Sequence, residues 1–372
     1  MTNKQLIQEN ELKKLIINQY SFIDVRSPNE FLKGSIRNAV NIPILSNDER
    51  HKVGVCFQRH GQDAAIELGN KIVSGTKKDK LVEKWSTFVR QKPNSIIYCA
   101  RGGLRSEICQ TWLNQNNIEC SRVIGGYKTI RNFLLSELKK ICMSQKLFLL
   151  SGTTGSGKTE LLKNINRAVD LERIANHKGS SFGKPLNDQP AQIDIENEIC
   201  INLIKLTNEN SRPILLEDES RNIGARHLPL ELSQAMEKSQ MVLVEVSFKE
   251  RIDLLLREYV VERYKDTLKF YRNSPRADLE FSNHLISSLK RLEKRLGGDK
   301  TKKILKLLET ALKVQKRDNF QSHRKWLEEI TTSYYDPLYE FKLEKRKDRI
   351  CFRGNHKEVL DWLKDKQKIQ VN

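Results

Sequence analysis

The sequence predicts an α/β protein in which two regions built on mostly parallel sheets precede a mainly helical, basic region. Short apolar runs alternate with helical patterns over about the first 260 residues, which is typical of a parallel sheet covered by helices. Two glycine-containing loops, at residues 99–106 and 152–159, each follow an apolar run and precede a helical pattern. Farther on, long amphipathic patterns rich in Lys and Arg replace the strands. We therefore predict three parts: residues 1–140, 145–260 and 261–372.

Hydrophobic periodicity predicts the elements of each part. In the first part, we expect strands at 22–25 and 95–98 and helices at 81–90 and 107–114. In the second part, we expect strands at 147–150, 213–217 and 241–246 and helices at 158–169, 192–206 and 249–259. In the third part, we expect helices at 279–296 and 302–314, and residues 334–343 are the only late strand-like run.

The composition describes a globular protein of at least two domains. The chain has 372 residues, 38% of them hydrophobic, with only 9 Pro and 18 Gly, which argues against a disordered chain. No apolar run reaches the roughly 18 residues of a membrane span, and the polar start lacks a signal-peptide core. Seven scattered cysteines do not suggest a disulfide framework. We expect a cytoplasmic protein with no membrane partner, and a monomer as the default state.

The formal net charge is +19 at pH 7, and most of the excess lies in the last third of the chain, from Arg251 onward. A basic region of this kind suits a polyanion such as RNA, DNA or an anionic membrane surface. A lysine-rich, solvated helical surface is the alternative. Charge alone does not choose RNA over DNA.

The loop at residues 99–106 is the first candidate for chemistry. Cys99 ends an expected strand, and the loop amides and the start of the next helix supply positive potential that favours a thiolate and binds oxyanions. Arg105 is the stronger candidate for a cation at the bound anion, whereas Arg101 is a second candidate that could equally pair with an acidic neighbour. Three small residues complete the anion loop: Gly102, Gly103 and Ser106.

A buried structural thiol is the alternative for Cys99. The other cysteines lack a comparable loop, and we expect core packing for most of them: Cys109, Cys120, Cys142, Cys200 and Cys351. Cys56 differs because it lies in the polar stretch 51–60, where it could resolve an intermediate on Cys99.

The second candidate loop reads Gly-x-x-x-x-Gly-Lys-Thr between an expected strand and an expected helix, the context that a phosphate-binding loop requires. Its backbone amides converge on phosphates, Lys158 neutralises them and Thr159 can hold Mg²⁺. The other loop residues are Gly152, Gly155, Ser156 and Gly157. The loop recognises a diphosphate, so a prenyl diphosphate satisfies it as well as ATP does, and the sequence leaves open whether ATP binds.

Two further segments are candidates for completing this phosphate site. Residues 214–219 resemble a Walker B strand, with Asp218 as the candidate metal-associated acid and a solvated acidic turn as the alternative. Residues 175–183 form a polar, glycine-containing loop that could face the ligand, a plain surface loop being the alternative.

Three separated motifs in the first part resemble those of rhodanese-like domains. They are Asp-Val-Arg-Ser-Pro-Asn-Glu-Phe at 24–31, residues 34–43 with Ser35 where rhodaneses usually have His, and Gly-Gly-Tyr at 125–127. The Cys99 loop also matches the protein tyrosine phosphatase signature and is one residue longer than a typical rhodanese loop. A longer loop should admit a larger tetrahedral anion than sulfane transfer requires.

The pairing of the two loops in one chain resembles the tRNA 2-selenouridine synthase family, and residues 41–54, 176–183 and 334–339 resemble it too. The resemblance implies conversion of 2-thiouridine to 2-selenouridine at the wobble position of the tRNAs for Lys, Glu and Gln. It implies S-geranylation with geranyl diphosphate, followed by selenation with selenophosphate, with Cys99 carrying the selenium.

The resemblance also implies a role for each part. Lys158, the loop amides and Mg²⁺ would stabilise the departing diphosphate, and the loop from Cys99 to Arg105 would hold selenophosphate. The basic third part would grip the anticodon arm of tRNA, and a selenophosphate-supplying protein is a further expected partner. Tyr334 and Tyr335 could stack on bases, core packing being the alternative.

Two other functions stay open from the sequence. A thiolate-based phosphatase would use Cys99 and Arg105, but it needs a general acid near the loop and gives the phosphate loop no clear purpose. A sulfurtransferase or sulfur-relay protein would use Cys99 as a sulfur carrier for an ATP-dependent partner.

Overall fold

The computed structural model describes residues 6–209, 212–316 and 319–365 of the chain. Contacts divide the chain into two compact units, residues 1–141 with 191–209 and residues 142–190 with 210–372. Each unit contains a five-stranded sheet in which every pairing is parallel. The predicted α/β class with parallel sheets is confirmed.

The sheet of the first unit has the order β1-β5-β4-β2-β3. Its strands are β1 (Leu6–Ile7), β2 (Phe22–Asp24), β3 (Ala39–Asn41), β4 (Ile96–Tyr98) and β5 (Ser121–Val123). The helices of this unit are α1 (Leu12–Ile17), α2 (Pro28–Leu32), α3 (Asn47–Ile72), α4 (Gly75–Gln91), α5 (Leu104–Gln115), α6 (Gly126–Ser144) and α9 (Gln192–Glu209), with the short η1 (Glu9–Glu11). Because β2 and β4 are parallel neighbours, the segments that follow them leave the same edge of the sheet.

The sheet of the second unit has the order β12-β11-β6-β8-β7. Its strands are β6 (Leu147–Gly152), β7 (Ala168–Val169), β8 (Ile214–Glu217), β11 (Gln240–Val244) and β12 (Ile350–Gly354), and β9 (Asn222–Ile223) pairs with β10 (Arg226–His227) in a separate antiparallel ribbon. The helices associated with this sheet are α7 (Lys158–Leu162), α8 (Leu171–Ile174), α10 (Leu230–Lys238) and α18 (His356–Asp365), with the short η2 (Ser181–Gly183) and η6 (Lys347–Arg349). The central strand β6 leads directly into the phosphate loop.

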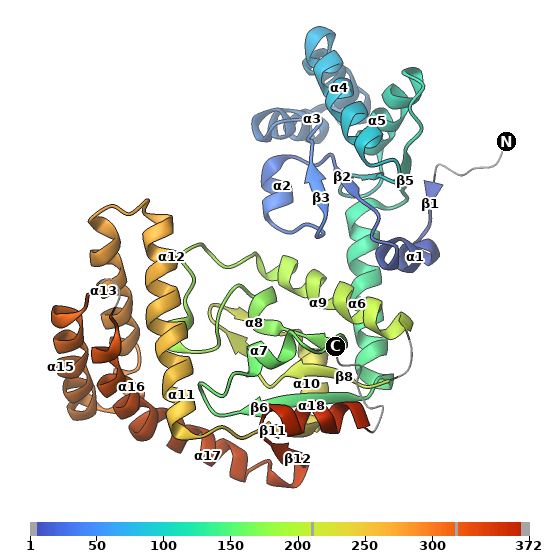
Figure 1. Cartoon of the computed structure of the whole chain (residues 1–372). Helices are drawn as coiled ribbons and strands as arrows, with labels where there is room; N and C mark the ends of the chain where they lie inside the picture. The colour runs from blue at the N-terminus through green and yellow to red at the C-terminus, as the bar shows by residue number, and fades with distance from the viewer. Residues whose placement is uncertain (1–5, 210–211, 317–318, 366–372) are drawn as a thin grey trace. The chain divides into compact units, whose positions relative to one another are not determined.

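The second unit also contains a helical bundle with an apolar core of its own. Its elements are α11 (Phe248–Leu255), η3 (Leu256–Glu262), α12 (Arg263–Phe270), α13 (Arg276–Lys290), α14 (Glu293–Leu296), α15 (Gly298–Val314), η4 (Gln321–His323), α16 (Arg324–Ile330), η5 (Thr331–Tyr335) and α17 (Asp336–Glu344). Helices α12, α13, α15 and α16 lie side by side in Figure 1. Both η3 and η5 are π-helical, a geometry often found at functional sites.

The strands expected in the first two parts and most expected helices are present, but two predictions were wrong and one strand was missed. Residues 334–343 form η5 and α17 instead of a strand, and Tyr334 and Tyr335 are buried in the core of the bundle. The helix expected over 158–169 ends at Leu162, and β7 follows. Strand β12 was not expected, because its short apolar run lies among charged residues. Among the helices that the structure describes, none has the length and apolar character of a membrane span.

Candidate active site

Cys99 lies at the end of β4, in a loop that leads into α5. Its side chain is buried, and Sγ lies 3.2 Å from Oγ of Ser106 and 3.7 Å from the carbonyl oxygen of Gly103. Gly102 has a φ of +64°, and a Cβ there would lie only 2.3 Å from the amide nitrogen of Gly125. The close approach therefore requires glycine at position 102, and it holds the loop against the turn before α6.

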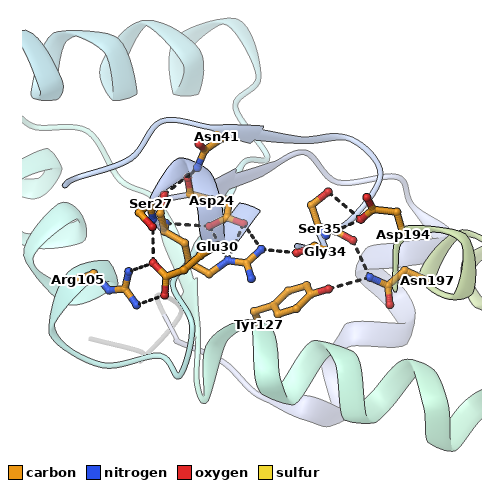
Figure 2. A network of polar contacts seen from close by, with 11 residues as sticks. Asp24, Ser27, Glu30, Gly34, Ser35, Asn41, Arg105, Tyr127, Asp194 and Asn197 are labelled. Atoms are coloured by element: carbon orange, nitrogen blue, oxygen red, sulfur yellow. Dashed lines mark hydrogen bonds and ion pairs between the residues drawn. The ribbon is translucent and has the colours of Figure 1, made fainter. Parts of the chain in front are cut away.

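Arg105 is fixed beside this loop by Glu30, the glutamate of the motif at 24–31, to which the sequence analysis gave no role of its own (Figure 2). Its two terminal nitrogens donate to the two carboxylate oxygens of Glu30 at 2.6 and 3.0 Å. Burial opposes ionisation of Glu30, but the hydrogen bonds and charge of Arg105, with the amide of Ser27, lower its pKa to about 2. The pair uses two of the five N–H donors of Arg105, so others remain for an anion. Arg101 is exposed, and Arg105 is the arginine that pairs with an acid.

A further cation, Arg122, also supports the loop. This residue of β5 donates from a terminal nitrogen to the carbonyl oxygen of Gly102 at 3.1 Å and from Nε to Gln110 at 3.0 Å. The sequence carried no signal for it, because Arg122 reaches the loop only through the neighbouring strand.

All seven cysteines are free thiols. Burial raises the pKa of Cys109 well above its ordinary value, and it raises those of Cys120 and Cys142 to about 12. These three cysteines are therefore protonated at neutral pH and poorly reactive. Cys56 is half-buried on α3.

The phosphate loop connects β6 to α7 as the sequence predicts. Gly155 and Gly157 have φ values of +80° and +72°, a region that glycine adopts without strain. Nζ of Lys158 donates to the carbonyl oxygen of Gly152 at 2.9 Å, which keeps the ammonium group against the loop. Ser156, within the loop, is buried, and Thr159 lines a cavity.

Three glutamates converge near this loop: Glu172, Glu217 and Glu219. Their carboxylates offer oxygen atoms that all lie within 4.8 Å of one another. Burial, followed by the charges of the other two glutamates, raises the pKa of Glu217 well above its usual range, and Lys158 opposes this. Burial and the charge of Glu172 raise the pKa of Glu219 to about 8. Clustered carboxylate oxygens fit Mg²⁺, which prefers hard oxygen ligands.

Asp218, the acid that the sequence suggested for this role, has other partners. Both terminal nitrogens of Arg346 donate to its carboxylate, at 2.9 and 3.1 Å, and Oγ of Ser151 donates to it at 2.5 Å. Its side chain is thus held by an ion pair, whereas those of Glu217 and Glu219 join the glutamate cluster. Glu172 lies 45 residues before Glu217, and no sequence pattern joined the two.

A cavity of about 700 Å³ adjoins Thr159 and Glu172 in the second unit. One part of its wall is apolar and includes Phe182, Pro185, Leu186, Tyr259 and Phe270. The rings of Phe182 and Tyr259 are stacked, with their centroids 5.6 Å apart. The polar loop at 175–183 contributes to the wall through residues 176–178, 182 and 183, so it does face the same cavity as Thr159 at the end of the phosphate loop.

Known proteins resemble the chain over nearly its whole length. The family model described as the tRNA 2-selenouridine synthase AAA domain matches residues 145–370, and the rhodanese-like domain matches residues 8–132. A tRNA 2-selenouridine synthase of Pseudomonas syringae pv. tomato is 42% identical over 96% of this chain and 97% of its own length. One from Hahella chejuensis is 41% identical over 94% and 92%, and one from Pseudomonas fluorescens is 40% identical over 98% and 100%. The chain is therefore an enzyme of the tRNA 2-selenouridine synthase family, with an N-terminal rhodanese-like domain and a P-loop-like AAA domain.

Proposed function

We propose that this enzyme converts 2-thiouridine to 2-selenouridine at the wobble position of the tRNAs for Lys, Glu and Gln. Its relatives are named tRNA 2-selenouridine synthases. The observation that supports two chemical steps is the presence of two anion-binding loops, one with Cys99 and the other with Lys158. A phosphatase or a sulfur carrier would need only the first loop.

The first proposed step is alkylation of the thiouridine sulfur by geranyl diphosphate in the phosphate-loop unit. The sulfur forms a bond to C1 of the geranyl group while the bond from that carbon to the diphosphate oxygen breaks. Lys158 and the loop amides neutralise the charge that builds on the departing diphosphate. Mg²⁺, when bound, supplies further positive charge, and the cluster of Glu172, Glu217 and Glu219 fits it.

The cavity beside Thr159 is the proposed site for the geranyl chain and the uracil ring. Its volume of about 700 Å³ is within the usual range for a site that encloses a small ligand. The aromatic and aliphatic side chains of its wall, among them Phe182, Tyr259 and Leu186, remove apolar carbon from water.

The second proposed step replaces the alkylated sulfur by selenium, with selenophosphate bound at the Cys99 loop. The selenium becomes bonded to C2 of the base while the bond from C2 to the alkylated sulfur breaks and geranylthiol leaves. The P–Se bond of selenophosphate also breaks, and water takes up the phosphoryl group as phosphate. Alkylation makes the sulfur a better leaving group and C2 of the base a better electrophile. Arg105 is held at the loop with donors still available for a tetrahedral anion. Glu30 is ionised at neutral pH and hydrogen-bonded to Arg105, so it is unsuited to the general-acid role that a phosphatase needs.

The helical bundle is the proposed tRNA-binding surface. Lys302, Lys306 and Lys313 are exposed on α15, and their spacing places them on one face of the helix. Phosphate contacts from such a face would position the anticodon arm without reading its sequence. Tyr334 and Tyr335 are buried and do not offer stacking surfaces in this structure.

Mass spectrometry of tRNA nucleosides tests the proposal. Thiolated tRNA is incubated with the enzyme and geranyl diphosphate, and selenophosphate is then added. We expect S-geranyl-2-thiouridine first and 2-selenouridine afterwards. If neither nucleoside forms, the proposal is wrong, and sustained Cys99-dependent hydrolysis of an aryl phosphate would instead support the phosphatase.

A further inference from the structure

Helix α9 comes from the phosphate-loop half of the sequence but packs in the unit that carries Cys99. It lies between the loop at 176–183 and strand β8, both of which belong to the phosphate-loop unit. Its contacts nevertheless place it in the unit that carries Cys99. The sequence of the phosphate-loop half therefore supplies part of the structure of the cysteine half.

Close apolar contact fixes α9 against this unit. Ile195, Ile199 and Leu203 of α9 are fully or almost fully buried, and the helix packs against α1. Cγ2 of Ile193 would lie 2.5 Å from a Cβ placed on Gly34. Gly34 thus lets α9 approach the segment that follows α2.

Polar contacts then join the first two turns of α9 to the same segment and to α6 (Figure 2). Oδ1 of Asp194 accepts hydrogen bonds from the amide and hydroxyl groups of Ser35, at 2.6 and 3.2 Å. Nδ2 of Asn197 donates to the carbonyl oxygen of Ser35 at 2.6 Å and to the hydroxyl oxygen of Tyr127 at 3.0 Å. Oδ1 of Asn197 accepts from Arg131 at 2.7 Å, and Asn197 is almost fully buried.

Tyr127 connects these contacts to the cysteine loop. Its backbone amide donates to the carbonyl oxygen of Cys99 at 2.8 Å. Tyr127 is therefore hydrogen-bonded to Asn197 through its hydroxyl group and to Cys99 through its backbone. The ring of Tyr127 lies 4.0 Å from the guanidinium carbon of Arg26. Arg26 donates to Asp24 and to the carbonyl oxygen of Gly34 at 2.8 Å, which closes the network.

We propose that Asn197 and Asp194 are positioning residues for the Cys99 loop, supplied by a helix from the phosphate-loop half of the sequence. Asn197 fixes Tyr127, and Asp194 fixes Ser35. Because Asn197 of α9 donates to the hydroxyl of Tyr127, and the amide of Tyr127 donates to the carbonyl of Cys99, a displacement of this helix alters how Tyr127 holds Cys99. The cysteine step therefore depends on a segment that comes from outside the rhodanese-like sequence.

The test is the pH profile of Cys99 alkylation by iodoacetamide in the full-length protein, with Cys99→Ser as the background. Asn197→Asp keeps the acceptor for Arg131 but removes both donated hydrogen bonds. Tyr127→Phe keeps the ring on Arg26 and removes only the hydroxyl. Asn202→Ala is the matched control on α9, because the hydrogen bonds that its side chain donates within the described part of the chain go to Glu198 of the same helix.

We expect Asn197→Asp and Tyr127→Phe to change the alkylation rate by about 2- to 30-fold, the effect of typical coupling energies, or to shift its pH midpoint. Asn202→Ala should leave the profile unchanged. An unchanged profile in both test variants, at wild-type melting temperature, would overturn the proposal. An equal change in the Asn202→Ala control would also overturn it, since the effect would then be general.

A second measurement follows the two tRNA steps separately and rests on the proposed function. Asn197→Asp and Tyr127→Phe should slow selenation while geranylation stays within about twofold of wild type. Equal losses in both steps would contradict a positioning role for Cys99. If the wild-type enzyme modified no tRNA, the proposed function would fail, whereas the alkylation profile would still decide the role of α9.

Discussion

At the scale of single residues, each of the two proposed steps depends on a different side chain, and the second step depends on Cys99. Cys99→Ser removes the thiol that we propose acts in selenation but keeps a small side chain beside Ser106, so the loop should persist. We expect selenation to be lost and geranylation to continue, as measured by nucleoside mass spectrometry. Cys56→Ser is the control, and a loss of selenation in that variant would instead give Cys56 the resolving role.

Lys158 belongs to the first step. Lys158→Ala removes the ammonium group that the structure holds against the phosphate loop. Loss of one preorganised charge-stabilising group commonly slows a reaction by about 10²–10³-fold, and we expect geranylation to fall by that factor. Selenation of tRNA that is already geranylated should stay near the wild-type rate. Intact geranylation in this variant would show that the diphosphate binds elsewhere.

Because of Glu30, we predict that the stability of the cysteine unit falls as the pH is lowered. Its pKa is lowered to about 2 in the folded protein, against an ordinary value of 4.5. The ionised carboxylate therefore stabilises the fold above about pH 4.5, and this contribution is lost as the pH falls towards 2. Glu30→Gln should lower the free energy of unfolding by about 1.5–3 kcal/mol at pH 7, the usual contribution of hydrogen bonds to a charged group.

The measurement is the melting temperature of Glu30→Gln and of wild type between pH 7 and pH 2.5. The two should differ at neutral pH and converge in acid. Glu107→Gln is the control, because Glu107 is exposed and lies 3.8 Å from its partner Arg122. A constant difference across the whole range would show that Glu30 keeps an ordinary pKa.

At the scale of elements, local sequence patterns were sufficient to predict the structure where a strand, a loop and a helix follow one another directly. The strand, the loop and the start of the helix around Lys158 were predicted correctly, because their residues are neighbours along the chain, whereas phosphate binding by this loop stays a prediction. Residues 334–343 failed for a tertiary reason. Their aromatic spacing suggests a strand, but Tyr334 and Tyr335 bury themselves in a helical core, and burial overrides intrinsic preference.

The parts of the candidate site that sequence reasoning missed come from distant elements. Glu30 meets Arg105 across 75 residues, and Glu172 meets Glu217 across 45. Neither pairing has a sequence pattern, because each arises where parallel strands bring their carboxyl ends to one edge. The helix expected at 192–206 was present as α9. Its place in the cysteine unit depends on contacts with Gly34 and Tyr127, which the hydrophobic periodicity of the sequence does not predict.

Helix α15 carries a prediction about tRNA binding. Neutralising Lys302, Lys306 and Lys313 together by substitution with Gln should weaken tRNA binding. The slope of log K against log salt should also fall, by about one for each tRNA phosphate that the variant no longer neutralises. Filter binding at several salt concentrations measures both quantities. Lys80→Gln with Lys84→Gln on α4 is the matched control for exposed lysines. Equal slopes for the α15 variant and wild type would exclude this face from the interface.

At the scale of the whole molecule, the proposed intermediate is a covalently alkylated tRNA and not a group bound to the protein. Such an intermediate survives dissociation, so the two loops need not belong to the same polypeptide during one catalytic cycle. We therefore expect a mixture of Cys99→Ser and Lys158→Ala proteins to form 2-selenouridine from thiolated tRNA, geranyl diphosphate and selenophosphate.

Each variant alone is the control and should form none or little of the selenium product. Nucleoside mass spectrometry with a time course should show S-geranyl-2-thiouridine rising before 2-selenouridine, since the intermediate must pass between molecules. Competition from excess unmodified tRNA should lengthen that delay, because it occupies the same basic surface. If the mixture accumulates the geranylated base but makes no selenouridine, one chain must present both loops to a single bound tRNA.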